Sequence, residues 1–143
     1  MIDDRLAPWG ATVIRLSLGV MWITHAFLKL LVYTPAGFVG FLESQGMPGV
    51  LAMPVIIAEI VGGVVILAGF YSRWASLALL PVLAGATVAH AANGWVFSNP
   101  NGGWEYPVFL IVVSLAHVLM GDGKLAVTGA FQPTRPLTAA RAG

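Results

Sequence analysis

The chain has 143 residues, of which 58% are hydrophobic and 9% are charged, and its mean hydropathy is +0.86. A soluble domain carries about a quarter charged residues, so this chain cannot cover itself with a water-facing surface. The formal net charge of +1 disfavours nucleic acid as a partner. With no cysteine, the sequence excludes disulfides and thiolate metal sites. The composition therefore indicates a small integral membrane protein whose main partner is the lipid bilayer.

Four apolar segments follow one another along the chain, each close to the roughly 20 residues that a helix needs to cross a bilayer. They cover about residues 8–33, 51–71, 74–94 and 104–121. The alternation of apolar and polar residues that a membrane β-barrel needs is absent from the sequence. We therefore predict an all-α, integral membrane four-helix bundle that forms a single domain over residues 1–143. Residues 34–49 are expected to form a longer connection, and residues 122–143 a short, mobile tail.

The basic residues orient the predicted bundle, because cytoplasmic flanks carry the excess of lysine and arginine. They lie before or early in the first segment, between the second and third, and after the fourth: Arg5, Arg15, Arg73, Lys124, Arg135 and Arg141. We therefore expect the N and C termini to be cytoplasmic. Arg15 is expected to extend to the cytoplasmic headgroups.

A few ionisable side chains fall inside the predicted spans, where a charge costs at least about 2.5 kcal/mol. At a rise of about 1.5 Å per residue, His25, Lys29, Glu59 and His90 all lie in the outer half of the bilayer, and Glu105 opens the fourth span at the same side. Such residues usually face the interior of a bundle. We therefore predict one polar cluster that draws on all four helices and opens outward.

The centre of this cluster is a predicted ion pair between Lys29 and Glu59, because each partner lowers the desolvation cost of the other. Trp22 and His25 share one helix face with Lys29, while Thr87, His90 and Asn93 form a polar stripe on the third span. The predicted catalytic residues are Glu59, Lys29 and His90, and the predicted ligand-binding residues are His25, Trp22, Asn93 and Glu105. The histidines would donate hydrogen bonds or carry protons, and Glu105 would act as an acid at the entrance.

A pocket of charged and hydrogen-bonding groups in an apolar wall suits a lipophilic ligand with polar oxygens, such as a quinone head group, or a proton relay. We expect no metal site, since no glutamate has a histidine three residues later. We also expect no haem, because nothing in the sequence selects iron ligation by His25 and His90 over hydrogen bonding. His117, alone on an apolar helix, is expected to be a satisfied buried histidine outside the site.

Several motifs resemble the DoxX family of small four-helix bacterial membrane proteins. They are His25-Ala26-Phe27-Leu28-Lys29-Leu30, Gly46-Met47-Pro48, Glu59-Ile60-Val61-Gly62-Gly63 with Gly69, Arg73, residues 86–90, Gly103-Trp104-Glu105-Tyr106 and Gly121-Asp122-Gly123. The resemblance covers about residues 10–130. The chain departs from the family pattern at Ala26, where the family often has glycine, and at Ala126-Val127-Thr128-Gly129, which replaces a Ser-Leu-Asp ending.

The resemblance implies a multi-pass protein of the bacterial inner membrane that is linked to redox chemistry. Its relatives include the membrane subunit of thiosulfate:quinone oxidoreductase and a component of oxidative-stress complexes with sulfurtransferase and superoxide dismutase partners. The leading hypothesis is therefore a quinone-binding or lipophilic-ligand-binding subunit, an oxidoreductase component, that works with a soluble or membrane redox partner. Whether it is catalytic and whether it forms a homo-oligomer are left open.

Two other classes of function are considered. One is a non-catalytic membrane scaffold that recruits redox partners, in which the Lys29–Glu59 pair is only structural. The other is a carrier of small solutes or protons, which needs a polar route to the cytoplasmic side. Between the outer cluster and Arg15 with His117 the sequence shows mostly leucine, valine and isoleucine, which disfavours a carrier.

Overall fold

A computed structural model describes residues 3–130 of the chain. The described residues form helices joined by short connections, and no strand occurs among them. The long helices are α1 (Ala7–Phe27), α3 (Ala52–Ala68), α4 (Ser72–His90) and α5 (Glu105–Met120). A π-helical turn, η1 (Leu28–Val32), extends α1, and the shorter elements are α2 (Thr34–Ser44), η2 (Gly49–Leu51), η3 (Ala91–Asn93) and α6 (Val127–Ala130).

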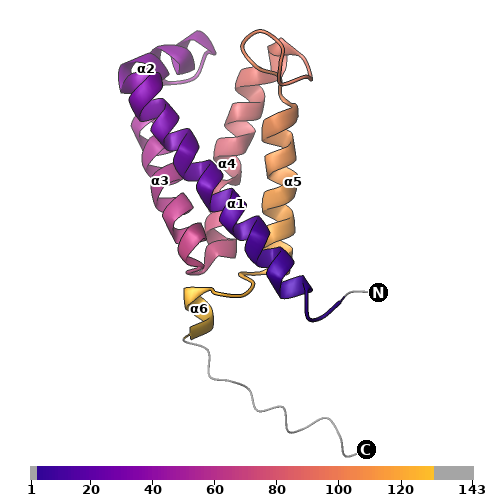
Figure 1. The fold of residues 1–143 in the computed structure, drawn as a ribbon. Coiled ribbons are helices and arrows are strands. Elements are labelled where there is room, and N and C mark those ends of the chain that lie inside the picture. The colour runs from indigo at the N-terminus through magenta and orange to yellow at the C-terminus, as the bar shows by residue number, and fades with distance from the viewer. Residues whose placement is uncertain (1–2, 131–143) are drawn as a thin grey trace, which may run out of the picture.

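The four long helices run alongside one another, with α1 crossing the bundle diagonally (Figure 1). α1 packs mainly on α3, α4 packs mainly on α5, and α3 joins the two pairs through α4. One end, called here the terminal end, holds the start of α1, the α3–α4 turn and residues 121–130. The opposite loop end holds α2, η2 and the connection 94–104 (Figure 1). The all-helical prediction is confirmed, whereas the assignment of the termini to the cytoplasm stays a prediction.

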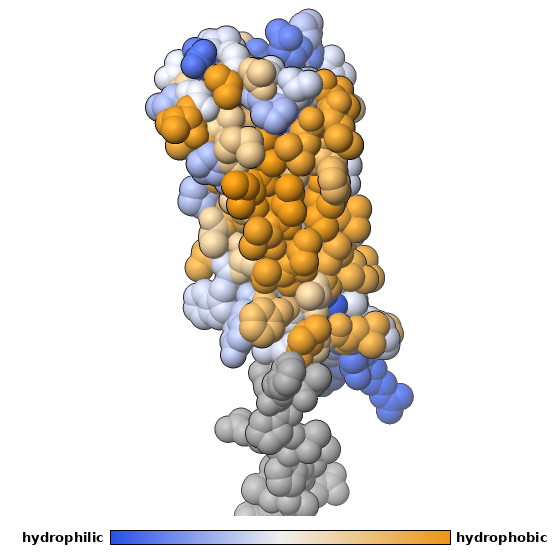
Figure 2. Space-filling model, turned by 90° about the vertical axis from the view of Figure 1, so that its left-hand side faces the viewer, coloured by the Kyte–Doolittle hydropathy of each residue, from blue (hydrophilic) through white to orange (hydrophobic). Residues whose placement is uncertain are grey.

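The helices present apolar side chains to their surroundings. Ala7–Val32, Gly49–Ala68 and Ser72–Asn93 are long and apolar enough to cross a membrane, and Glu105–Met120 is a shorter apolar helix. Figure 2 shows a broad hydrophobic surface along the bundle, with hydrophilic residues gathered toward its ends. Large exposed apolar residues occur on all four long helices and include Val13, Val20, Ile57, Val61, Val64, Leu77, Val88, Phe109 and Val112. Such an extended apolar surface is unfavourable in water, so the helices are surrounded by the lipid bilayer.

Small residues allow the helices to approach closely, as expected where lipid gives little hydrophobic drive for association. A Cβ atom on Gly63 would lie 3.1 Å from the main-chain nitrogen of Ile23, so α3 meets the backbone of α1 there. A Cβ on Gly62 would meet the side chain of Leu79 on α4. The Gly62-Gly63 pair thus lets α3 pack closely on both α1 and α4. Gly85 of α4 differs, because a Cβ there meets no atom within 4 Å.

The connection of residues 34–49, expected as a loop, contains the helix α2. Its first turn is held by Thr34, whose Oγ1 accepts a hydrogen bond from the Gly37 N–H at 3.2 Å. Phe38 and Leu42, one turn apart, are buried against Ala52 and Ile56 of α3. Burial of this apolar pair outweighs the weak helix propensity of the glycines, so α2 covers the loop end of α3.

The end of the chain was expected to be a mobile tail from residue 122. Residues 122–128 instead bind the bundle: the Lys124 N–H donates to Thr12 Oγ1 at 2.7 Å, and Thr128 Oγ1 donates to the Gly69 carbonyl at 2.7 Å. Gly69 ends α3 in the left-handed conformation, with φ +68°. The remainder of the predicted tail, residues 131–143, lies outside the described residues.

Candidate functional site

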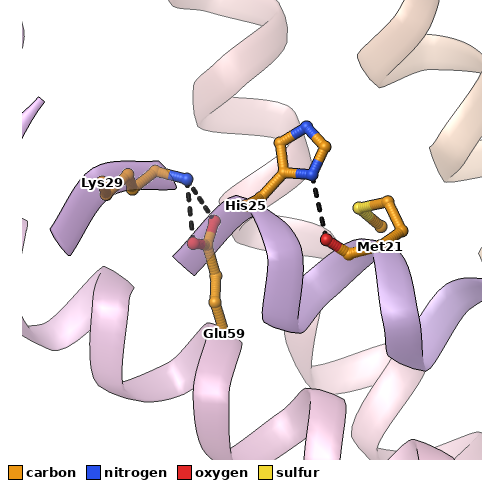
Figure 3. Close-up of polar contacts among 4 residues, drawn as sticks. All are labelled: Met21, His25, Lys29 and Glu59. Atoms are coloured by element: carbon orange, nitrogen blue, oxygen red, sulfur yellow. Dashed lines mark hydrogen bonds and ion pairs between the residues drawn. The ribbon is translucent and has the colours of Figure 1, made fainter. Parts of the chain in front are cut away.

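The centre of the candidate site is an ion pair between α1 and α3. Lys29 Nζ lies 2.8 Å from Oε1 and 2.8 Å from Oε2 of Glu59, so the ammonium group contacts both carboxylate oxygens (Figure 3). The Glu59 side chain is 3% exposed and that of Lys29 is 17% exposed. The predicted partners therefore meet. The Glu59 carboxylate is buried inside the bundle, and only part of the Lys29 side chain reaches the surface. Such a pair persists only because each charge offsets the desolvation of the other.

A change in helix type positions Lys29. The π-helical turn Leu28–Val32 widens the end of α1 immediately after its last α-helical residue, Phe27. Such turns are rare and occur often at functional sites. The Lys29 ammonium also lies 5.3 Å from the centre of the Phe38 ring, which belongs to α2, a distance suited to cation–π attraction. α2 therefore covers the ion pair from the loop end.

His25 lies one turn before Lys29 and beside the ion pair (Figure 3). Its Nδ1 is 2.9 Å from the Met21 carbonyl oxygen, which can only accept, so Nδ1 carries the proton and donates it. The ring stacks on that of Tyr106 with centroids 5.8 Å apart. In the neutral ring, Nε2 is then an unprotonated acceptor, and no hydrogen bond to it occurs among residues 3–130.

A shallow groove runs along the outside of α1 at His25. Its lining residues are Leu16, Ser17, Val20, Met21, Thr24, His25 and Tyr106. The sides are mainly apolar, and the groove opens laterally on the bilayer-facing surface of the bundle. Sequence reasoning missed Tyr106 as a site residue, although it stands next to Glu105 at the start of the fourth span. Its stacking partner lies on another helix and could not be inferred from spacing.

Trp22 occupies the core of the bundle. It is 1% exposed and packs with Leu18, Ile66, Leu79, Leu83 and Leu110. Its Nε1 is buried and has no hydrogen-bond partner among the described residues. Trp22 does not line the groove beside His25. The structure therefore assigns it mainly to packing.

His90 and Asn93 were expected to face the same pocket as the ion pair, but they bind the connection that follows α4. His90 Nδ1 donates to the Asn101 carbonyl at 3.0 Å. Asn93 Nδ2 donates to the Asn101 and Gly102 carbonyls at 3.2 and 2.9 Å. The polar stripe exists, but it is used to order a loop, because loop carbonyls beyond the helix end need donors. A catalytic role for His90 is untested.

Glu105 was expected to be an acid at the entrance of the pocket. Its Oε1 accepts the Phe97 N–H at 2.9 Å, and its own N–H donates to the Trp95 carbonyl at 3.0 Å. The rings of Trp95 and Trp104 meet edge to face nearby, with centroids 4.4 Å apart. Glu105 therefore holds the connection 94–104 against the start of α5. It belongs with His90 and Asn93 rather than with the ion pair.

A second polar cluster lies at the terminal end and is centred on Arg15. The expectation that Arg15 extends to the headgroups is wrong, because the residue is 1% exposed. All three guanidinium nitrogens donate to main-chain carbonyls from two separate segments: Ile66, Leu67, Asp122, Lys124 and Leu125. The guanidinium has five N–H groups, so this set satisfies every donor. Arg15 thereby joins α1, the end of α3 and the segment after α5.

His117 is completely buried beside this cluster and is hydrogen-bonded, as expected for a satisfied histidine. Its Nε2 lies 3.2 Å from Ser72 Oγ, and its Nδ1 lies 2.8 Å from Ser76 Oγ. Ser72 Oγ also donates to Asp122 Oδ1 at 2.7 Å. Sequence reasoning missed both serines. The only available signal was their i, i+4 spacing at the start of the third span, which places them on one helix face.

The two histidines, the ion pair and the acid of the predicted pocket therefore fall into two separate groups. Within residues 3–130 no group of three or more His, Asp or Glu side chains is arranged to hold a metal ion. The described contacts bring together Lys29 and Glu59, with His25 beside them. His90, Asn93 and Glu105 organise the loop end.

The apolar surface, the helix lengths and the buried ion pair define a multi-pass membrane protein built on a small helical bundle. Comparison with protein families matches residues 10–92 to DoxX, which is more than half of the chain. The chain belongs to the DoxX family. The matched region holds Arg15, His25, Lys29, Glu59 and His90, whereas α5 lies beyond it.

Among characterised sequences, the chain is similar to the inner membrane protein YqjF of Escherichia coli (strain K12). The two are 34% identical over 73 residues, which cover 51% of this chain and 55% of the relative. The chain thus spans about half the length of this curated relative. The predicted localisation, a multi-pass protein of the inner membrane, is confirmed. No solved structure matches the chain.

Proposed function

We propose that this protein is a subunit of a membrane redox system that binds a quinone or a similar lipophilic ligand in the groove beside His25. The proposed system resembles thiosulfate:quinone oxidoreductase or the oxidative-stress complexes of the family. The observation that carries the proposal is the position of His25, which lines a bilayer-facing groove and lies beside the buried Lys29–Glu59 pair. A ligand dissolved in the membrane can enter such a groove directly from the lipid.

The groove offers the chemistry that the head group of a quinol, the reduced form of a quinone, needs. Leu16, Val20 and Met21 supply apolar sides, and Tyr106 with His25 supplies a stacked aromatic pair. Because Nδ1 of His25 is bound to Met21, Nε2 of the neutral ring can accept a hydrogen bond from a ligand hydroxyl. Pockets of this kind combine an apolar wall with a few polar groups that fix orientation.

His25 can also hold a proton. A quinone that is reduced to its quinol takes up two electrons and two protons, and oxidation releases them again. When a bound quinol is oxidised, Nε2 of His25 would accept one of the two protons and water would take the other, and the carboxylate of Glu59 would stabilise the imidazolium that forms. The electrons would pass to or from the redox partner. Since the sequence contains no cysteine, any sulfur transfer takes place on the substrate or on that partner.

The experiment measures binding of ubiquinol-1 and of menaquinol-1, the reduced forms whose hydroxyls can donate to Nε2 of His25, to the full chain in lipid nanodiscs. The variants are His25→Phe, which keeps an aromatic ring but removes Nε2, together with Glu59→Gln and Lys29→Met. We expect His25→Phe to weaken binding at least tenfold and the other two to weaken it severalfold. Glu43→Gln, an exposed carboxylate at the loop end, is the matched control. Equal affinity for either quinol in all folded variants, or no binding by the wild type, would overturn the proposal.

A scaffold function is the second candidate, and the geometry of the ion pair favours it. Both Glu59 oxygens are already occupied by Lys29, so the pair is complete without a ligand. A scaffold needs the pair only to fix how α1 and α3 meet. In that role the double variant Lys29→Met, Glu59→Leu would still recruit a redox partner, and changes on exposed surfaces would abolish recruitment.

A further inference from the structure

A polar pocket opens at the terminal end of the bundle, between the start of α4 and the segment that follows α5. Its volume is about 350 Å³, near the lower end of the range for small-ligand sites, and its walls are mainly polar. Such a volume suits a polar head group rather than a whole lipid or cofactor. The lining residues are Tyr71, Arg73, Trp74, Gly121, Asp122, Gly123, Ala126 and Thr128.

Asp122 is the anionic group of this pocket and is held from two sides. Its main-chain carbonyl accepts a hydrogen bond from Arg15 Nε at 2.8 Å. Its Oδ1 accepts from Ser72 Oγ at 2.7 Å and from the Arg73 main-chain N–H at 3.3 Å. The second carboxylate oxygen, Oδ2, has no hydrogen-bond partner among residues 3–130. A negative charge is thus fixed in place with one oxygen left to accept from a ligand.

The glycines on either side of Asp122 make this position possible. Gly121 and Gly123 have φ values of +83° and +71°, a region that favours glycine. A Cβ on Gly123 would lie 2.6 Å from the main-chain nitrogen of Thr12, so the chain lies directly on α1. The Gly121-Asp122-Gly123 motif therefore returns the chain across the end of the bundle and brings the carboxylate to the start of α4.

Arg73 is the cationic group of the same pocket. Its Nη2 donates to the Val118 carbonyl at 2.6 Å, which anchors the guanidinium at the end of α5. Within residues 3–130 this side chain makes no other hydrogen bond and no ion pair with Asp122. Arg73 is exposed, so most of its five N–H groups remain available to a ligand. Opposite charges that line one pocket without pairing can bind the two charges of a zwitterion.

The pocket borders the apolar surface of the bundle. Trp74 and Leu77, which are neighbours on one face of α4, are both exposed, so apolar side chains lead from the pocket along this helix. Tyr71 is also exposed, and tryptophan and tyrosine gather at the head-group level of membranes. A lipid at this place would put its charged part in the pocket and its hydrocarbon chains on α4.

We propose that the terminal-end pocket binds the head group of a zwitterionic phospholipid. The phosphate would accept hydrogen bonds from the Arg73 guanidinium, and the ammonium group would lie against Oδ2 of Asp122. An anionic head group fits less well, because Asp122 would repel it. The acyl chains would follow Trp74 and Leu77. This site is separate from the groove at His25 and does not depend on quinol binding.

The test measures binding of two phospholipids with identical acyl chains to the full chain by native mass spectrometry from detergent micelles. Phosphatidylethanolamine carries a phosphate and an ammonium group, whereas phosphatidylglycerol carries only the phosphate charge. We expect the wild type to bind phosphatidylethanolamine about three- to fivefold more tightly, the scale of one exposed ion pair. Asp122→Asn keeps the acceptor for Ser72 but removes the charge, so it should abolish this preference. Arg73→Gln should weaken binding of both lipids about tenfold or more.

Matched controls alter charges at the same end of the molecule. Asp4→Asn and Lys124→Gln each remove one charge from an exposed residue outside the pocket, and both should bind the two lipids as the wild type does. A further arm adds O-phosphoethanolamine, the head group without acyl chains. We expect it to compete poorly, because it lacks the chains that contact α4. Displacement of the lipid by an equal concentration of it would assign the site to a soluble phosphate ester and overturn the proposal.

Two other results would also overturn the proposal. One is equal affinity of the wild type for the two lipids. The other is a preference for phosphatidylethanolamine that survives in Asp122→Asn, or unchanged lipid binding in Arg73→Gln. Thermal unfolding in micelles separates loss of binding from loss of fold, and added phosphatidylethanolamine should raise the Tm of the wild type more than that of Arg73→Gln. A failure of quinol binding would not affect any of these results.

Discussion

Arg15 Nε donates a hydrogen bond of 2.8 Å to the main-chain carbonyl of Asp122, which lies 107 positions later in the chain. The same guanidinium binds the carbonyls of Ile66 and Leu67, where α3 ends. The negative end of the α3 dipole and several main-chain carbonyls thus surround one buried positive charge. One side chain therefore fixes the start of the bundle to two later segments.

Replacement of Arg15 should loosen the terminal end. Arg15→Met leaves the carbonyls of residues 122–125 without their donor, and we expect the free energy of unfolding to fall by at least about 3 kcal/mol. Arg15→Lys keeps the charge but offers three donors instead of five, so its loss should be smaller. Unfolding in mixed micelles measures both. Arg5→Met, at an exposed position, is the control, and an equal loss there would contradict the assigned role of Arg15.

Lys29 and Glu59 should show strong energetic coupling. Lys29→Met leaves an almost fully buried carboxylate unpaired, which costs about 3–5 kcal/mol in comparable pairs. Adding Glu59→Leu removes that unpaired charge, so the double variant should be more stable than Lys29→Met alone. A double-mutant cycle of unfolding free energies measures the coupling. Strictly additive losses would show that the ion pair contributes nothing beyond its separate side chains.

Two glycines of the long helices should respond oppositely to alanine. A Cβ on Gly63 would lie 2.7 Å from a side-chain carbon of Ile23 and 3.1 Å from its main-chain nitrogen, so α1 and α3 would have to separate. We expect Gly63→Ala to destabilise the protein by about 1–3 kcal/mol. Gly85→Ala meets nothing within 4 Å and should be neutral or slightly stabilising, because alanine favours the helix. Similar losses of stability in both variants would show that the close contact between α1 and α3 does not explain the effect of Gly63→Ala.

The sequence predicted the long helices because each apolar segment must be long enough to cross the bilayer, whatever its neighbours are. It also predicted the Lys29–Glu59 pair, since two buried opposite charges have few alternatives to meeting. α2 was missed because its glycines suggest a loop, and only the burial of Phe38 and Leu42 against α3 reveals a helix. Local sequence carries no information about that tertiary contact.

The partners of Arg15 and His117 could not be predicted for a similar reason. Arg15 binds main-chain carbonyls, and every residue carries one, so no residue type marks them. The serines that bind His117 come from another helix. For His90, by contrast, the sequence predicted a partner that the structure does not show. Its position on a polar stripe suggested that it faces the same pocket as the ion pair. Its actual partner, the Asn101 carbonyl, lies in a loop that spacing along a helix cannot place.

Glu105 offers a test of whether the loop end is organised as the structure shows. Its carboxylate accepts the Phe97 N–H at 2.9 Å, and hydrogen bonds to charged groups contribute about 1.5–3 kcal/mol. Glu105→Ala should therefore speed hydrogen exchange of the Phe97 amide about tenfold or more, while amides within α3 keep their protection. Glu105→Gln retains an acceptor oxygen and should give a smaller change. If Glu105 instead served only as an acid at a pocket entrance, as its place in the sequence suggested, neither variant would alter exchange at Phe97. Glu43→Ala, in the exposed part of α2, controls for the loss of a carboxylate at the same end of the molecule.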